Sequence, residues 1–181
     1  MLNKTFIPFP VLTTERLTLR RPVMNDEREI FTLRSDSEIN KYLDRQLSTT
    51  IDDARNFIKK VNENINNNDS LYWAITLSDQ NILVGTICLF SFSEENETCE
   101  IGYELLTSFQ GQGIMTEAVE KVIDYAFNTI KVQKIEAFFH RDNRSSIKLL
   151  QKFSFRDSNE PDKTDPDLLY FYLKNPVDNL Q

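Results

Sequence analysis

Two of the four glycines in this chain lie in one short stretch, residues 110–115, between a strand-like run and a long amphipathic run. Backbone without side chains at the start of a helix exposes unpaired N–H groups, and the positive end of the helix dipole lies at the same place. Such a turn binds anions, above all phosphate. Gly111 and Gly113 therefore predict a phosphate-binding turn.

The spacing of these glycines leaves more than one interpretation of the turn open. A P-loop needs a Lys-Ser or Lys-Thr pair directly after its last glycine, and nothing of that kind follows Gly113. A dinucleotide-binding fingerprint needs a third glycine, but Thr116 stands at that position. A plain strand-to-helix turn without a ligand is the remaining alternative.

Two carboxylates are candidates for proton transfer. Glu100 and Glu104 share one face of a predicted strand with Gly102, because side chains alternate along a strand. Either carboxylate can accept a proton from an ammonium group, directly or through water, or hold a cationic amine. Solvated surface glutamates are the alternative. The only histidine, His140, follows a strand into a loop, where we expect a structural or surface role.

The elements that must position these residues follow from hydrophobic periodicity. A strand is predicted over residues 17–20, and Asp26 and Glu29 have the spacing of a capping box at the start of a helix. A second amphipathic helix should end in the asparagine-rich residues 62–68. The pattern then predicts an antiparallel meander over residues 72–77, 82–92 and 98–106, a long helix after the glycine turn, a strand over 134–139, a helix capped by Asn143 and a last strand over 168–173.

Composition sets the wider limits. We expect the 181 residues to form a single domain, residues 1–181, with its core over about 13–173. The net charge of −7 argues against nucleic-acid binding, which needs lysine and arginine to replace counterions. No long apolar run predicts a membrane span or a signal peptide, and two cysteines are too few for a disulfide framework. A cytoplasmic protein is the expectation, and one histidine with two distant cysteines predicts no metal site.

Several segments resemble one family of enzymes. The stretch from Gln110 to Ala118 resembles the acyl-CoA-binding motif of the GNAT superfamily of N-acetyltransferases, in the form typical of the branch that acetylates ribosomal-protein N-termini. Residues 14–20, 101–105 and 142–155 resemble the opening strand, the fourth strand and the last helix of that branch, although Ser154 replaces a glycine. The resemblance implies an α+β fold with a mostly antiparallel central sheet, flanked by helices and splayed open beside the fourth strand.

The resemblance also implies acetyl-CoA as the cosubstrate and a place for it. The pantetheine arm is expected to pair with the main chain of Leu105 and Leu106, like a missing strand. Asn143 occupies the place of an asparagine that contacts the cofactor in the family, and a plain helix cap is its alternative role. The pyrophosphate is expected on the amides of the glycine turn, Gln110, Gly111, Gln112, Gly113, Ile114 and Met115.

The catalytic residues are less strongly implied. Many relatives use a tyrosine seven residues after the asparagine to protonate the leaving thiolate, but Leu150 stands there. Ser146, on the first turn of the same helix, is our candidate for that donor, with helix capping as the alternative. The resemblance favours Glu100 and Glu104 as candidate general bases, because the corresponding strand borders the acyl site in the family. Cys88 is not assigned a nucleophile's role, so direct attack in a ternary complex is expected.

The acceptor is predicted from the free energy of deprotonation. An α-amine has a pKa near 8 and costs about 1 kcal/mol to deprotonate at neutral pH, whereas a lysine amine costs about 4–5 kcal/mol. A protein or peptide N-terminal α-amine is therefore the expected partner. A small-molecule amine such as a polyamine, amino acid or aminoglycoside remains the alternative, as does a non-catalytic acyl-CoA sensor. A homodimer is also left open.

Overall fold

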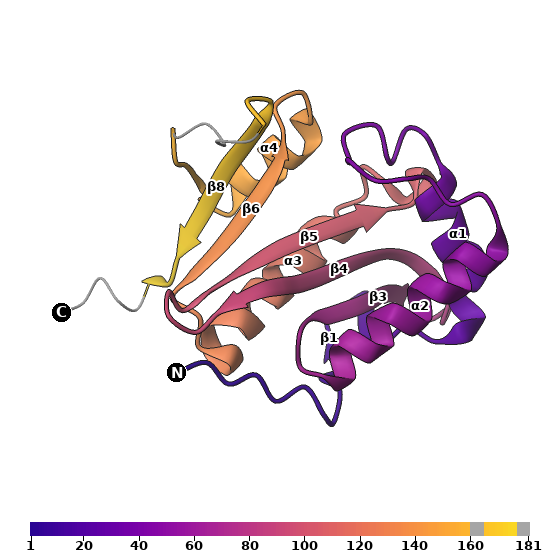
Figure 1. Cartoon of the computed structure of the whole chain (residues 1–181), viewed down its shortest axis with the longest axis horizontal. Coiled ribbons are helices and arrows are strands. Elements are labelled where there is room, and N and C mark those ends of the chain that lie inside the picture. The colour runs from indigo at the N-terminus through magenta and orange to yellow at the C-terminus, as the bar shows by residue number, and fades with distance from the viewer. Residues whose placement is uncertain (160–164, 177–181) are drawn as a thin grey trace.

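The computed structural model describes residues 1–159 and 165–176, and these build one central sheet (Figure 1). The strand order is β1-β2-β3-β4-β5-β6-β8-β7. Neighbouring strands are antiparallel except β5 and β6, which are parallel. The strands are β1 Leu12–Thr13, β2 Leu17–Arg20, β3 Leu71–Leu77, β4 Leu83–Ser93, β5 Thr98–Leu105, β6 Lys134–His140, β7 Arg156–Asp157 and β8 Leu168–Lys174. The expected α+β fold with a mostly antiparallel sheet is confirmed.

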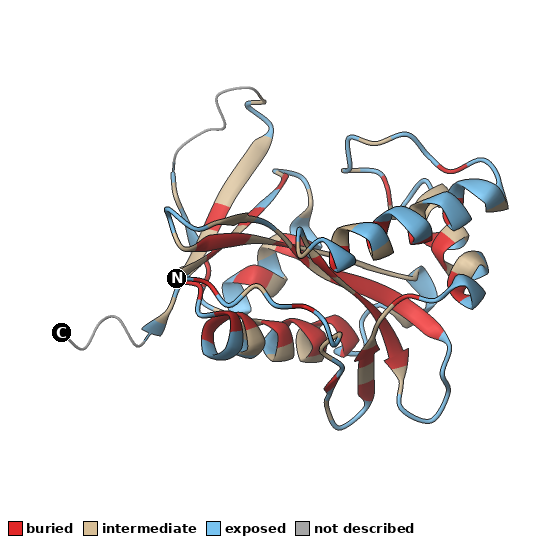
Figure 2. Ribbon diagram, turned by 60° about the horizontal axis from the view of Figure 1, so that its bottom comes forward, coloured by how far each residue is buried: buried red, intermediate tan, exposed pale blue. Residues whose placement is uncertain are grey.

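Helices cover both faces of the sheet (Figures 1 and 2). Helices α1 and α2 lie on one face, and α3 lies on the other. A π-helical turn, η3, continues α3 to Ile130. None of the helices in the described ranges has both the length and the apolar character needed to cross a bilayer. The helical elements are η1 Met24–Asp26, α1 Glu27–Ser35, α2 Ile51–Asn66, η2 Thr107–Phe109, α3 Ile114–Tyr125, η3 Ala126–Ile130 and α4 Arg144–Lys152.

The two faces of the sheet carry separate apolar clusters, as the alternation of strand residues requires. Trp73 and Ile75 of β3 belong to the larger cluster, which includes the apolar side of α3. Ala74, between them, belongs to the smaller cluster formed with α1 and α2. The indole nitrogen of Trp73 donates to the Pro10 carbonyl at 2.8 Å, so the chain before β1 is tied to the larger core.

The sheet opens between β5 and β6. These strands pair only at their first residues, where Thr98, Cys99 and Glu100 lie opposite Lys134, Ile135 and Glu136. Beyond Glu100, β5 stays paired with β4 as far as Leu105, whereas β6 pairs with β8 along its whole length. The two halves of the sheet therefore diverge, with β6, β8 and α4 on one side of the opening (Figure 1). The expected splay is confirmed.

One local expectation was wrong. Asp26 does not cap α1 with its side chain; its carboxylate accepts hydrogen bonds from Arg20 at 2.7 and 2.9 Å and from the Val23 amide at 2.8 Å. A capping box forms instead at Thr50, the N-cap of α2. Helix α2 ends at Asn66, within the asparagine-rich stretch as predicted, and the Asn62 side chain donates to the Ile58 carbonyl one turn earlier.

Candidate active site

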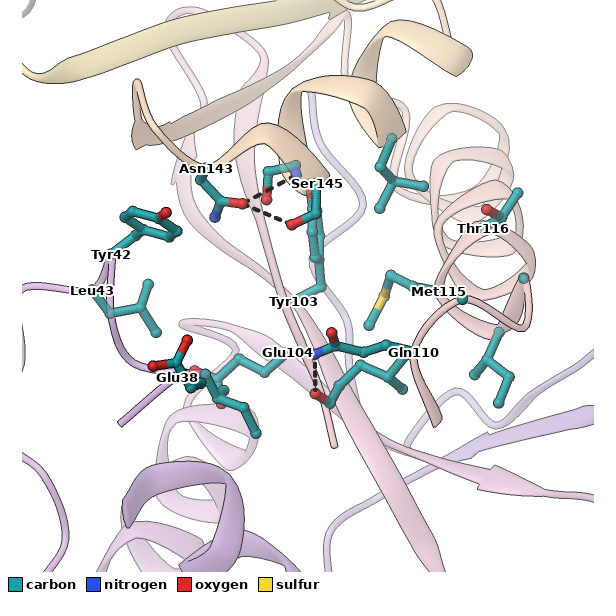
Figure 3. Close-up of a pocket in the computed structure, with 17 residues that line it drawn as sticks. Glu38, Tyr42, Leu43, Tyr103, Glu104, Gln110, Met115, Thr116, Asn143 and Ser145 are labelled. Carbon is teal, nitrogen blue, oxygen red and sulfur yellow. Dashed lines mark hydrogen bonds between the residues drawn. The ribbon is translucent and has the colours of Figure 1, made fainter. Parts of the chain in front are cut away.

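A cavity of about 510 Å³ lies where the sheet opens (Figure 3). Four parts of the chain meet there: the end of β5, the glycine turn with the start of α3, the start of α4, and the loop that follows α1. The lining residues are Glu38, Ile39, Tyr42, Leu43, Tyr103, Glu104, Leu105, Gln110, Gly111, Gly113, Ile114, Met115, Thr116, Asn143, Ser145, Ser146 and Leu149. Most of the residues predicted to bind the cosubstrate or to act in catalysis are thus brought together.

The glycine turn has the backbone conformation that only glycine adopts freely. Gly111 and Gly113 have φ angles of 73° and 77°, and Gly113 is the N-cap of α3. A Cβ at Gly111 would meet no atom within 4 Å, so the backbone is open to a ligand there. The amides of Ile114 and Met115 lie in the first turn of α3, where no intrahelical acceptor exists. This geometry suits a pyrophosphate, and its binding at the turn stays a prediction.

A clasp from residues 14–16, between β1 and β2, holds this turn in place. The Arg16 guanidinium donates to the Gln112 carbonyl at 3.0 Å and to the Glu117 carboxylate at 2.7 Å. The Arg16 amide and the Thr14 hydroxyl also donate to Glu117. Burial raises the pKa of Glu117, but these hydrogen bonds outweigh it, and the pKa is lowered overall. Arg16 and Glu117 were missed because 101 positions separate them in sequence and no local pattern links them.

The structure separates the two leucines that were expected to pair with the pantetheine arm. The Leu106 amide donates to the Val84 carbonyl at 2.9 Å, and its carbonyl accepts from the Phe109 amide at 2.9 Å. Main-chain groups alternate between the two sides of a strand, so those of Tyr103 and Leu105 are directed to the open side of β5. The Leu105 carbonyl accepts there from the Gln110 side chain at 3.2 Å. Leu105 suits the expected role, whereas Leu106 is already paired within the protein.

The start of α4 presents three polar side chains to the cavity. The Asn143 side-chain oxygen accepts from the Ser146 amide at 3.2 Å and from the Ser145 hydroxyl at 2.9 Å (Figure 3). Asn143 is thus the N-cap of α4, as predicted. Its side-chain NH₂ group takes no part in this cap and remains a donor for a ligand. Ser146 is largely buried, with 9% of its surface exposed.

Tyr103 lines the cavity from β5, and Ser146 lines it from α4. Burial raises the pKa of the Tyr103 phenol to about 12, and the Ser146 side chain opposes this rise. Tyr103 is therefore a neutral hydroxyl at physiological pH. Alternation along β5 places Tyr103 on the face opposite to Glu104. Candidate residues were predicted only on the face of this strand that carries Glu104, so Tyr103 was missed.

Glu104 lines the cavity on the side of α1 and α2, and it is ion-paired with Arg45 from the loop after α1. Arg45 is held in turn by the Asn40 side chain, which accepts from its Nε at 2.6 Å. The second carboxylate oxygen, Oε2, is buried and has no hydrogen-bond partner among the described residues. A buried unpaired carboxylate oxygen is costly, so this atom calls for a donor from a ligand.

The structure does not bring Glu100 to the cavity. Burial raises the pKa of Glu100; the Ser91 side chain opposes the rise, and Glu136 adds a smaller increase. Glu104 is four residues further along the strand, which corresponds to roughly 13 Å. His140 is also outside the lining; its ring stacks on Tyr42 with centroids 5.4 Å apart, which matches the expected structural role.

Neither cysteine lines the cavity. Burial raises the pKa of the Cys88 thiol to about 12 and that of Cys99 further still. Since only the thiolate is a good nucleophile, both are poorly suited to carry an acetyl group. Among the described residues, no three histidine, cysteine or acidic side chains gather in a way that would hold a metal ion.

Comparison with known proteins agrees with this geometry. The model of the acetyltransferase (GNAT) domain matches residues 16–156. An uncharacterized N-acetyltransferase, p20, of Bacillus licheniformis is 34% identical over 145 residues, which are 80% of this chain and 82% of that protein. A putative ribosomal N-acetyltransferase of Bacillus subtilis, YdaF, is 30% identical over 97 residues, covering 50% of this chain and 53% of YdaF.

A solved structure that contains coenzyme A has the same fold. RimL, a ribosomal L7/L12 α-N-protein acetyltransferase in complex with coenzyme A, superposes with a TM-score of 0.79 at 19% identity, covering 91% of this chain and 98% of RimL. The family model spans most of the chain, and the cavity has the glycine turn, the open strand and the capped helix that acyl-CoA binding requires. The chain therefore belongs to the GNAT family and is an acetyl-CoA-dependent N-acetyltransferase.

Proposed function

We propose that this enzyme acetylates a primary amine that binds at Glu104, and that the acceptor is a protein or peptide N-terminal α-amine. The observation that carries the proposal is the buried Oε2 atom of Glu104, which has no partner among the described residues although it belongs to a side chain lining the cavity. An amine N–H donor at this atom satisfies it. Because Arg45 is paired with the other oxygen, the carboxylate is held in one orientation.

The other residues take roles that follow from their positions. Bound acetyl-CoA supplies an acetyl group activated as a thioester. The amides from Gln110 to Met115 hold the pyrophosphate, the Leu105 main chain pairs with the pantetheine amide, and Asn143 donates to the same arm. Ser146 donates to the leaving sulfur, and Glu104 orients the amine and receives its surplus proton directly or through water. The amine attacks the thioester directly, without an acyl-enzyme.

An α-amine suits this site better than a lysine amine. The α-amine costs about 1 kcal/mol to deprotonate at neutral pH, compared with about 4–5 kcal/mol for lysine. Only one carboxylate of the cavity lining, Glu104, is buried and anchored by an ion pair, while Glu38 lies in the exposed loop. The similarity to YdaF, a putative ribosomal N-acetyltransferase, supports a protein N-terminus as the acceptor.

A small polyamine is the second candidate. Glu38 and Glu104 both line the cavity, and two carboxylates can hold two cationic nitrogens of one molecule (Figure 3). The peptide acceptor needs only Glu104, whereas the polyamine also needs Glu38. Replacing Glu38 with glutamine therefore separates the two candidates.

The test is thiol release from acetyl-CoA by the purified enzyme, with an acceptor panel and a blank without acceptor. The panel holds peptides with free and with blocked N-termini, spermidine, amino acids and an aminoglycoside. Release that requires a free peptide N-terminus, persists in Glu38→Gln and falls in Glu104→Gln supports the proposal. Release with spermidine that falls in Glu38→Gln selects the polyamine. Binding of acetyl-CoA without any acceptor-dependent release contradicts both and favours an acyl-CoA sensor.

A further inference from the structure

The Glu104 carboxylate is connected to the end of α1 through two side chains of the loop that follows this helix. Arg45 is ion-paired with Glu104 Oε1 through its Nη1 atom. The Arg45 Nε atom donates to the Asn40 side-chain oxygen at 2.6 Å. The side-chain NH₂ group of Asn40 donates in turn to the carbonyls of Leu33 at 2.8 Å and Asp36 at 2.7 Å. A carboxylate on β5 is thereby tied to the main chain at the end of α1.

We propose that Asn40 is a positioning residue for acetyl transfer, because it fixes the Arg45 guanidinium and, through it, the orientation of the Glu104 carboxylate that meets the acceptor amine. This inference rests on the role proposed for Glu104. Asn40 does not itself line the cavity, so it acts on the amine only through these two side chains.

The partners of Asn40 explain why an amide stands at this position. An arginine side chain only donates hydrogen bonds, and a main-chain carbonyl only accepts them. The residue between them must therefore accept on one side and donate on the other, which directs the Asn40 oxygen to Arg45. Aspartate would set a charge against two carbonyl oxygens, and leucine would offer neither group. Asn40 is 6% exposed, so water has little access to replace a lost partner.

The ion pair itself is poorly arranged to stabilise the fold. The Arg45 Nη2 and Glu104 Oε2 atoms are both buried and have no hydrogen-bond partner among the described residues. Unpaired buried donors and acceptors are costly, and a buried ion pair often adds no net stability. Such costs are expected at functional sites, where the orientation of a group matters more than its contribution to stability.

The same asparagine also fixes part of the cavity wall. The Leu43 amide donates to the Asn40 carbonyl at 3.0 Å, and the Leu43 carbonyl accepts from the Arg45 amide at 3.0 Å. Leu43 lines the cavity beside Glu104. Proton transfer from an amine depends on the position of the accepting oxygen, and a displacement of about 1 Å can lower a rate about 100-fold. Main-chain and side-chain bonds of Asn40 thus hold the acceptor side of the site in one arrangement.

The first test replaces Asn40 with an apolar residue of similar size. In Asn40→Leu we expect kcat/KM for the amine to fall about 10-fold, because the carboxylate is no longer held in place. The affinity for acetyl-CoA should stay near the wild-type value, since the glycine turn is formed by other residues. Rates are measured with the fastest acceptor of the panel described above, a peptide with a free N-terminus if the proposed function holds.

Asn62 provides a matched control within the same chain. Its side-chain oxygen accepts from the Arg21 Nε atom, and its NH₂ group donates to the carbonyls of Pro22 at 3.1 Å and Ile58 at 2.9 Å. These are the same three kinds of partner that Asn40 has, but Asn62 lies on α2 outside the cavity. Asn62→Leu should therefore lower the stability to urea as Asn40→Leu does, and change kcat/KM by less than about 2-fold.

The second test acts on Arg45 and leaves Asn40 in place. Arg45→Lys keeps the positive charge, but a single ammonium cannot bond to Asn40 and Glu104 as the two edges of a guanidinium do, so kcat/KM should again fall about 10-fold. In Arg45→Ala, added guanidinium chloride should raise the rate, whereas the same concentration of sodium chloride should not. Guanidinium should leave Glu104→Gln unchanged. In a Glu104→Gln background, Asn40→Leu should have no further effect on kcat/KM.

The outcomes separate this inference from the proposal on which it rests. If Asn40→Leu and Asn62→Leu lose stability alike and neither loses kcat/KM, Asn40 is only structural, while a loss in Glu104→Gln leaves the proposed function standing. Losses that multiply in the Asn40→Leu, Glu104→Gln double variant also overturn the inference. If Asn40→Leu does not fold, full activity in Arg45→Lys overturns it instead.

Other results would contradict the proposed function itself. If Glu104→Gln keeps the wild-type kcat/KM, or if no acceptor of the panel reacts, the role of Glu104 is wrong and the role of Asn40 falls with it.

Discussion

Strand β5 has two halves that differ in what lies on their outer edge. Over Thr98–Glu100 the strand is paired with β4 on one side and β6 on the other. From Tyr103 to Leu105 it is paired only with β4, and the cavity takes the place of the second neighbour. Main-chain groups in the second half still need partners, because unpaired backbone polar groups are costly when buried. We propose that an acyl-CoA arm supplies them, which puts the binding site where the β5–β6 pairing stops.

The two glutamates of this strand show the same difference at the level of side chains. Glu100 and Glu104 have the same residue type, the same strand and the same face. Glu100 lies in the closed half, paired with Phe90 of β4 and Glu136 of β6. Glu104 lies in the open half, where Arg45 occupies one oxygen and the other has no partner among the described residues. Position relative to the opening, rather than residue type, separates a structural carboxylate from a functional one.

The largest effect should come from a substitution in the glycine turn, which lines the cavity beside the open half of β5. Gly113→Val places a β-branched residue at a φ of 77° and a Cβ 3.4 Å from the Arg16 guanidinium. We expect affinity for acetyl-CoA to fall at least about 100-fold, because two or more amide hydrogen bonds to phosphate are displaced. Gly113→Asn is the control, since asparagine tolerates left-handed backbone. Titration calorimetry measures both, and full affinity in a folded Gly113→Val protein would exclude phosphate binding at this turn.

The comparison of the glutamates is tested by the same substitution at both positions. Glu104→Gln should lower kcat/KM for the amine about 10- to 100-fold, the effect of losing a hydrogen bond to a charged group, while acetyl-CoA affinity stays near the wild-type value. Glu100→Gln should change kcat/KM by less than about 2-fold, as expected of a residue outside the site. Steady-state rates with varied acceptor give both numbers. Equal losses in the two variants would remove the distinction between the halves of β5.

A smaller effect is expected from the clasp that holds the turn. The pKa of Glu117 is lowered in the folded protein, so its contribution to stability is present above its unfolded pKa of about 4.5 and is lost as the pH falls through the folded value. Wild type should therefore be more stable than Glu117→Gln at pH 7, and the difference should shrink below about pH 4.5. Urea unfolding across this pH range measures it. A difference that persists unchanged at pH 3 would show that ionisation of Glu117 is not responsible.

The smallest effect is expected from a thiol on the neighbouring strand, β4. Cys88 lies beneath Gly102, and burial raises its pKa to about 12. Cys88→Ala should change kcat by less than about 2-fold, because a buried neutral thiol outside the cavity takes no part in transfer. Mass spectrometry of enzyme mixed with acetyl-CoA alone should show no acetylated cysteine. An acetylated Cys88 would instead indicate a covalent intermediate.

Sequence alone determined most of the helices and strands, and it predicted a ligand class for the glycine turn. Periodicity located β3, β4, β5, α3 and β6 to within a few residues, because strand and helix repeats are local properties. Two glycines before an amphipathic helix predicted a phosphate site, since helix amides and the dipole are also local. Asn143 was recognised as a cap for the same reason. Among the strands of the described residues, the very short β1 and β7 carried no pattern long enough to detect.

Tertiary structure alone decided which of these residues meet. The partners of Glu104 and Glu117 are Arg45 and Arg16, and each comes from a distant part of the chain. Such pairs depend on how strands and loops assemble, which no local repeat encodes. Glu104 rather than Glu100 lies at the cavity because β6 stops pairing with β5 after Glu100. Leu105 rather than Leu106 has main-chain groups directed to the open side of β5 because these groups alternate along the strand. Both are set by long-range pairing, because hydrogen-bond register is a property of the whole sheet rather than of one strand.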